Sequence, residues 1–71
     1  MFKTQKFNIS GMTCASCQAN ITKSVEKLNG ISDVNVSLLS NQMTVNYNDD
    51  ILTSNEIINA VNKIGYGAEL I

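Results

Sequence analysis

Apolar residues alternate with polar ones in three stretches of this chain, a pattern typical of strands with one buried face. The alternating positions are Phe7 and Ile9, then Val34, Val36 and Leu38, then Met43, Val45 and Tyr47. We expect the first strand to run from Lys3 to Ile9. The second and third strands are separated by Leu39-Ser40-Asn41, which has the length and residue types of a hairpin turn. A short last strand is expected from Tyr66 to Ile71.

Two other stretches carry apolar residues at helical spacing. These positions are Cys17, Ile21, Val25 and Leu28 in the first stretch, and Ile57, Ile58, Val61 and Ile64 in the second. The first helix is expected from about residue 15 to residue 28, with Gly30 as its C-terminal glycine. Thr53 and Glu56 have the spacing of a capping box at the start of the second helix. Gly65 is expected to end that helix.

The predicted order is strand, helix, strand, strand, helix, strand. This is the split βαβ, ferredoxin-like arrangement. Packing two helices on one face of a four-stranded antiparallel sheet is the simplest way to bury all these apolar faces. The sequence therefore predicts an α+β fold, and its 71 residues predict a single domain over residues 1–71.

The charge and hydropathy of the chain exclude several classes of function. A formal net charge of −1 provides no basic surface for nucleic acid. Apolar runs of two or three residues are too short to span a bilayer, and no charged segment leads into an apolar one as in a signal peptide. We therefore expect a cytoplasmic setting, where a close pair of cysteines more often binds metal or acts chemically than forms a structural disulfide.

Both cysteines of the chain lie in the segment Gly11-Met12-Thr13-Cys14-Ala15-Ser16-Cys17, at the expected start of the first helix. The N–H groups of a helix N-terminus favour negative charge, so we expect lowered thiol pKa values there, with Cys17 closer to the helix dipole. Two thiolates without a histidine are too few for a typical zinc site. Soft thiolate ligands suit Cu(I). A thiol–disulfide redox pair remains the alternative, because the same spacing at a helix start serves that chemistry.

The cysteine segment after a strand, together with Gly65-Tyr66 late in the chain, resembles the heavy-metal-associated domain. That family includes copper chaperones and the N-terminal modules of copper-transporting P-type ATPases. The resemblance covers essentially the whole chain. It implies that Cys14 and Cys17 are the metal ligands, with Cys14 on the exposed loop and Cys17 in the first helical turn.

Three further residues surround the ligands by the same resemblance. Met12 matches a loop methionine that packs inward and does not bind the metal. Thr13 stands where an acidic residue marks the zinc and cadmium carriers of the family, so it favours copper. Tyr66 matches an aromatic residue that approaches the metal site and is expected to shield it.

The sequence thus predicts a non-catalytic, Cu(I)-binding metal-transfer domain. The preferred context is the cytosolic N-terminal module of a copper-exporting P-type ATPase, and the first alternative is a free-standing copper chaperone. A Hg(II)-binding domain and a thiol–disulfide redox domain are less favoured. We expect a monomer in the absence of metal, and a copper chaperone or an ATPase metal-binding domain as the transfer partner.

Overall fold

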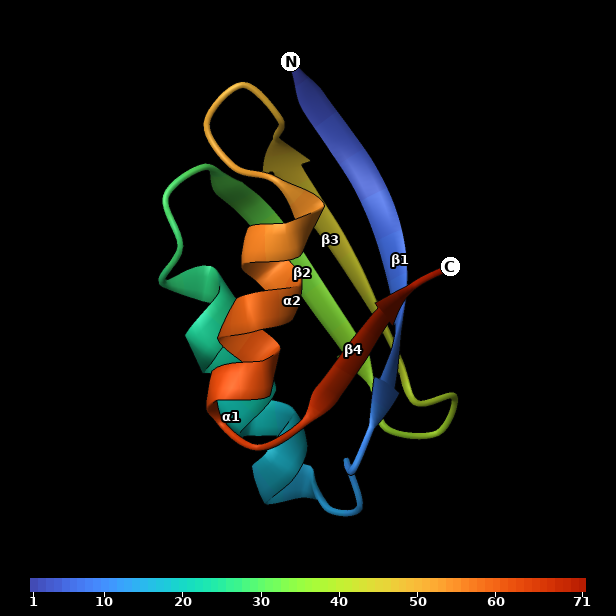
Figure 1. Cartoon of the computed structure of the whole chain (residues 1–71). Coiled ribbons are helices and arrows are strands. Elements are labelled where there is room, and N and C mark those ends of the chain that lie inside the picture. The colour runs from blue at the N-terminus through green and yellow to red at the C-terminus, as the bar shows by residue number, and fades with distance from the viewer.

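Six secondary-structure elements follow one another in the predicted order. In the computed structural model, which describes all 71 residues, they are β1 (Phe2–Ser10), α1 (Ala15–Glu26), β2 (Ile31–Ser37), β3 (Gln42–Asn48), α2 (Ser54–Lys63) and β4 (Gly67–Leu70). The strands form one antiparallel sheet in the order β2-β3-β1-β4, and both helices lie on the same face of it (Figure 1). The ferredoxin-like fold is confirmed. Neither helix has the length and apolar composition needed to cross a membrane.

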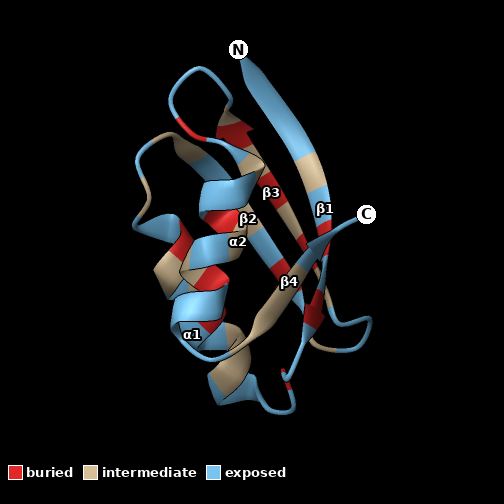
Figure 2. Ribbon diagram, in the orientation of Figure 1, coloured by how far each residue is buried: buried red, intermediate tan, exposed pale blue.

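The core lies between the two helices and the covered face of the sheet (Figure 2). Its members are all apolar or aromatic: Phe7, Ile9, Met12, Ile21, Val25, Val36, Met43, Val45, Tyr47, Leu52, Ile57 and Val61. Strand register explains the arrangement, since Met43 in β3 lies opposite both Phe7 in β1 and Val36 in β2. One predicted core position is wrong. Ile64 is 37% exposed because it is the C-cap of α2 and lies past the last full turn of the buried face.

The end of α1 also differs from the prediction. The helix stops at Glu26, with Lys27 as its C-cap in a right-handed conformation, two residues earlier than the apolar spacing indicated. Gly30 does not cap the helix. It has a φ of +98°, and a Cβ there would lie 3.1 Å from the Cβ of Ile51. This glycine therefore permits a close approach between the α1–β2 connection and the β3–α2 loop.

The start of α2 is as predicted. The Glu56 backbone N–H donates to the Thr53 hydroxyl, and the Thr53 backbone N–H donates to the Glu56 carboxylate, each at 3.3 Å. Two donors that would otherwise be free at the helix N-terminus are thereby satisfied, which is the capping box.

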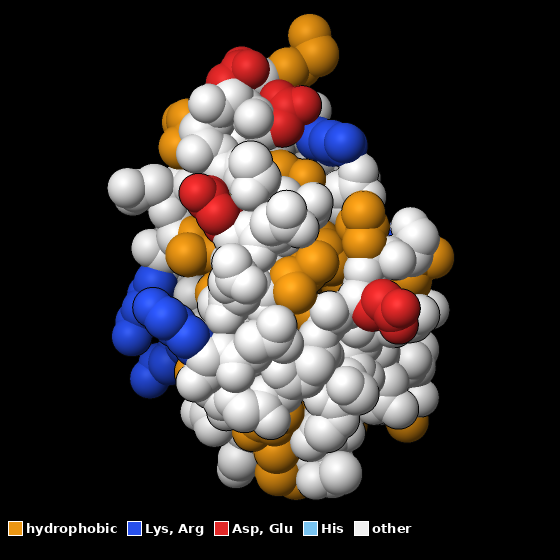
Figure 3. Space-filling model, in the orientation of Figure 1, with side chains coloured by type: hydrophobic (Ala, Val, Ile, Leu, Met, Phe, Trp, Pro, Cys, Tyr) orange, Lys and Arg blue, Asp and Glu red, His pale blue; other side chains and the backbone are white.

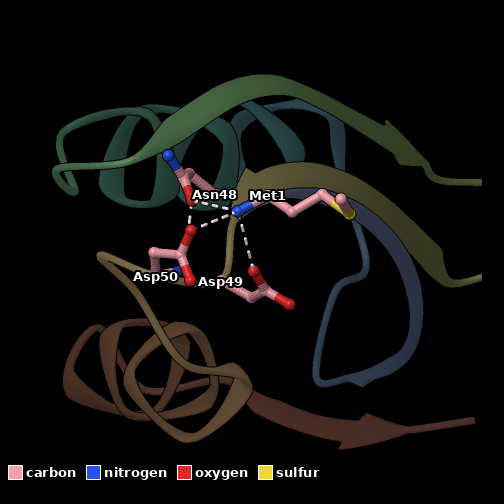
Figure 4. A network of polar contacts seen from close by, with 4 residues as sticks. All are labelled: Met1, Asn48, Asp49 and Asp50. Carbon is pink, nitrogen blue, oxygen red and sulfur yellow. Dashed lines mark hydrogen bonds and ion pairs between the residues drawn. The ribbon is translucent and has the colours of Figure 1, made fainter.

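A network of charged groups lies at one end of the sheet (Figure 4). The Met1 ammonium group forms ion pairs with Asp49 at 3.2 Å and Asp50 at 2.5 Å, and it donates to the side-chain oxygen of Asn48 at 3.0 Å. Hydrogen bonding to Asp50 is the largest cause of the raised pKa of this ammonium group. These contacts hold the start of β1 against the β3–α2 loop. The cysteine loop lies at the opposite end of the molecule (Figure 1).

Candidate metal site

The two cysteines lie where the β1–α1 loop enters the first turn of α1. Cys14 is the N-cap residue, with an extended backbone (φ −150°, ψ 169°), and its carbonyl oxygen accepts the first helical hydrogen bond from the N–H of Gln18 at 3.2 Å. Cys17 follows one turn later on the same side of the helix. Cys14 is exposed and Cys17 is half-buried. Their sulfur atoms are only 3.2 Å apart.

The sulfur pair is an open, two-ligand site. A disulfide needs a separation of about 2.05 Å, so at 3.2 Å the two residues are free thiols joined by a hydrogen bond. No group of three or more His, Cys, Asp or Glu side chains that could hold a metal ion occurs in the chain. An ion bound here would have two protein sulfurs and a free side facing solvent. A ligand from another molecule could reach it from that side.

The pKa of Cys17 is lowered from 9.0 to about 6. The largest cause is hydrogen bonding by the Tyr66 side chain, followed by the backbone of Thr13 and the side chain of Cys14. Desolvation opposes these effects. Hydrogen bonding to a sulfur stabilises its charged form, so the lowered pKa favours the thiolate of Cys17 at neutral pH. The sequence predicted the direction of this shift but attributed it to the helix dipole, whereas the first cause is a residue 49 positions away in the chain.

Tyr66 reaches the cysteine loop because of how α2 ends. The Gly65 N–H donates to the carbonyl of Asn62 at 3.1 Å, and the Tyr66 N–H donates to the carbonyl of Val61 at 3.3 Å. With the positive φ of +92° at Gly65, these bonds form a Schellman motif that reverses the chain. The Tyr66 ring then lies against Gly11, where a Cβ would be 3.5 Å from its Cδ1 atom. These contacts place the Tyr66 ring beside the start of the cysteine loop.

Met12 and Thr13, the other two residues expected near the ligands, differ in their burial. Met12 is 5% exposed and belongs to the core cluster, so its side chain faces the interior. Thr13 is exposed, and its backbone helps to lower the pKa of Cys17. Met12 therefore anchors the loop to the core, and Tyr66 contacts the loop at Gly11.

Residues 6–67 match the profile of the heavy-metal-associated domain. This match covers most of the chain, including both cysteines, Met12 and Tyr66. The chain belongs to that family.

Two kinds of copper protein occur among the relatives of this heavy-metal-associated domain. It is 34% identical over 67 residues to the copper chaperone CopZ of Enterococcus hirae, covering 94% of this chain and 97% of the chaperone. It is 32% identical over 68 residues to a copper-exporting P-type ATPase of Staphylococcus aureus strain JH9, covering 96% of this chain but only 8% of that protein. The chain therefore spans a small part of the length of such ATPases.

A solved structure agrees with both the fold and the sequence likeness. The N-terminal domain of a potential copper-translocating P-type ATPase from Bacillus subtilis, determined in its Cu(I)-loaded state, superposes with a TM-score of 0.94 at 34% identity. The match covers 99% of this chain and 88% of that one.

One residue beside the heavy-metal-associated motif was missed by the sequence reasoning. The Gln18 side-chain amide donates to the carbonyl oxygen of Val36 at 2.6 Å. This bond ties the first turn of α1, which carries Cys17, to the outer edge of β2. Glutamine on a helix surface gives no sequence signal of such a contact, because the partner is a backbone carbonyl 18 residues away.

Proposed function

We propose that this chain binds one Cu(I) ion between Cys14 and Cys17 and hands it to another protein. The observation that carries the proposal is the pair of free sulfur atoms 3.2 Å apart at the surface, with no third ligand from the chain. The copper proteins among its relatives support the choice of metal.

The donor set favours Cu(I) over zinc. Structural zinc sites use four ligands and catalytic sites use three with a water, whereas this site supplies two. Thiolates are soft ligands that suit Cu(I). Thr13 precedes Cys14 and brings no carboxylate to the loop. Competition with Zn(II) and Hg(II) tests this preference directly, because the thiol pair also suits mercury.

The mechanism follows from the open side of the site. Cys14 is exposed, so a thiolate from a partner can approach the bound ion and form a third bond before either bond in this chain breaks. Cys17 is held on α1, and hydrogen bonding keeps its sulfur in the thiolate form. Tyr66 covers the loop from the α2–β4 side and limits the access of water. No bond of a substrate is made or broken in the chain itself, so we propose that the domain is not catalytic.

The biological context is part of the proposal. We prefer the N-terminal module of a copper-exporting P-type ATPase, on the cytoplasmic side, with a copper chaperone as the metal donor. A free-standing chaperone that delivers copper to such an ATPase domain is the alternative, supported by its likeness to CopZ along nearly the whole of that protein. The length of the encoded open reading frame distinguishes these two contexts.

Titration of the reduced protein with Cu(I), against a competing chelator and without oxygen, tests the binding proposal. We expect one Cu(I) per chain in the wild type and loss of tight binding in the Cys14→Ser/Cys17→Ser variant, because serine hydroxyls are hard ligands that stay protonated. The matched control is Ser16→Ala, which changes an exposed residue between the cysteines and should bind as the wild type does. Tight binding by the double variant would show that the site is elsewhere.

The same thiol pair could instead exchange disulfides, since the sulfur atoms are close and the pKa of Cys17 is low. A disulfide-exchange assay with a dithiol substrate separates this alternative. Turnover of the wild type, together with weak Cu(I) binding, would favour it over copper transfer.

A further inference from the structure

Charged residues are absent from two long stretches of the chain and from the short connection between α2 and β4. Residues 7–22, 34–48 and 64–68 contain no Asp, Glu, Lys, Arg or His. The eleven charged side chains all fall in the remaining segments. The fold does not require these stretches to be uncharged. Most of their positions are exposed or half-buried, and a charged side chain there could remain in contact with water.

The fold brings the loops of these three stretches to one end of the molecule. They are the cysteine loop, the β2–β3 turn at residues 38–41 and the α2–β4 connection. The Ile9 N–H, near the end of β1 that leads into the cysteine loop, donates to the carbonyl of Asn41 at 2.7 Å, which holds the β2–β3 turn beside the start of that loop. The Tyr66 ring against Gly11 links the first and third. We call the surface of these three loops the metal end.

The face drawn in Figure 3 shows the result, with neither blue nor red side chains at the lower end of the molecule. The charged network of Met1, Asp49 and Asp50 lies at the opposite end (Figure 4). Lys63 is close to the α2–β4 connection in the chain, but its side chain lines a groove on the helical face together with Ser24 and Lys27. The metal end therefore carries no charge except that of the thiolates themselves.

An apolar side chain projects from this uncharged surface. Leu39, in the β2–β3 turn, is 100% exposed and covers nothing in its own chain. A single exposed leucine is ordinary. Leu39 is suited to contact a partner because it lies at the end of the molecule that carries the cysteines and has no charged residue around it.

We infer that the metal end recognises its transfer partner by uncharged, apolar contact in which Leu39 is buried, and not by charge complementarity. The inference rests on the proposed function and adds the chemistry of the partner: a metal-carrying domain whose own thiol pair is surrounded by uncharged surface. A partner with a charged rim would lose the hydration of its charges here without gaining a counter-charge. A partner with a neutral rim has no such loss.

The experiment uses a second copy of this chain as the probe, since its metal end has the required chemistry. Cu(I)-loaded, ¹⁵N-labelled protein is mixed with unlabelled apo protein, and the rate of copper exchange is followed by NMR from about 20 to about 500 mM salt. We expect the rate to change by less than about twofold, whereas electrostatically steered association changes by tenfold or more. A tenfold change in the wild type would overturn the inference.

Two matched pairs of variants test the surface itself. Ser40→Asp places a charge at the metal end, and Ser32→Asp places the same charge at the exposed start of β2, at the other end. Only Ser40→Asp should slow exchange at low salt and recover at high salt. Leu39→Ala should slow exchange by about threefold or more, while Ile51→Ala, which shortens an exposed isoleucine in the β3–α2 loop, should not.

Copper loading is measured on every sample before exchange. A wild type that binds no Cu(I) refutes the proposed function, and the inference with it. One Cu(I) per chain with exchange that is unaffected by Leu39→Ala or Ser40→Asp overturns the inference and leaves the proposed function intact.

Discussion

Replacing Tyr66 with phenylalanine separates the role of its hydroxyl group from that of its ring. Hydrogen bonding by Tyr66 is the largest cause that lowers the pKa of Cys17 from 9.0 to about 6. The ring lies against Gly11 and packs against the core, and phenylalanine keeps both contacts. Tyr66→Phe therefore removes the donor to the sulfur while leaving the shape of the loop unchanged.

The expected size of the effect follows from the two pKa values. At pH 7, a thiol with a pKa of about 6 is about 90% thiolate, and one with a pKa of 9.0 is about 1% thiolate. Without its largest stabilising interaction, the pKa of Cys17 should rise toward 9.0. A rise of about one would leave about half of the thiol ionised at pH 7. The rate of alkylation at pH 7 should fall accordingly, by about twofold or more.

The lowered pKa of Cys17 also makes the stability of the fold depend on pH. The folded pKa of Cys17 lies below its ordinary value, so its contribution to the free energy of unfolding is complete above about pH 9 and is lost as the pH falls through about 6. In Tyr66→Phe, the loss should still begin near pH 9, where the unfolded chain titrates, but it should end at a higher pH, and the whole contribution should be smaller.

The assay is alkylation with iodoacetamide between about pH 5 and 9, followed by peptide mapping to separate the two cysteines. Tyr47→Phe is the matched control, because Tyr47 is a buried tyrosine in β3 whose pKa is raised by burial and not by a thiol. We expect the Cys17 profile to move to higher pH only in Tyr66→Phe. If the profiles of Tyr66→Phe and the wild type superimpose, the hydroxyl does not tune the thiol.

The remaining predictions concern stability and are read from urea unfolding of the reduced protein. Thr53→Ala should cost about 0.5–2 kcal/mol through loss of the capping box. Ile57→Ala, at a fully buried position, should cost about 2–5 kcal/mol and leave a domain of this size close to unfolding. Gly30→Ala should destabilise more than Gly65→Ala, because both have a positive φ but only Gly30 has neighbours within 4 Å of the added Cβ. Equal losses would show that backbone strain alone, and not the contact with Ile51, decides the effect.

The elements of this fold could be predicted because their signals are local. Alternation placed β1, β2 and β3 within a few residues of their observed bounds, and Thr53 with Glu56 placed the start of α2. The end of α1 was predicted two residues too late, because Leu28 continues the apolar spacing although the chain has already left the helix. Leu28 packs against the core from the connection that follows α1, so spacing alone could not separate the two cases.

The closeness of the two thiols could be predicted from the sequence, but the interactions that lower the pKa of Cys17 could not. Cys14 and Cys17 are close in the chain, and a helix start fixes their separation. Two contacts near them involve residues far away in the sequence: the Tyr66 side chain, which is the largest cause of the lowered pKa of Cys17, and the Val36 carbonyl in β2, which accepts from Gln18. Such contacts depend on how α2 ends and on where β2 lies in the sheet. No spacing rule along the cysteine segment contains that information.

The difference in burial between Met12 and Cys14 leads us to expect that copper binding and folding are separate properties of this chain. Met12 is 5% exposed and part of the core, whereas Cys14, two residues later, is exposed and packs against nothing in it. None of the twelve core residues is a cysteine, so we predict that the reduced protein folds without the metal and that the metal adds stability only by binding to the native state. A loop fixed at Met12 and at the first turn of α1 keeps both sulfurs in place before an ion arrives. An ion can then leave for a partner without unfolding the domain that carried it.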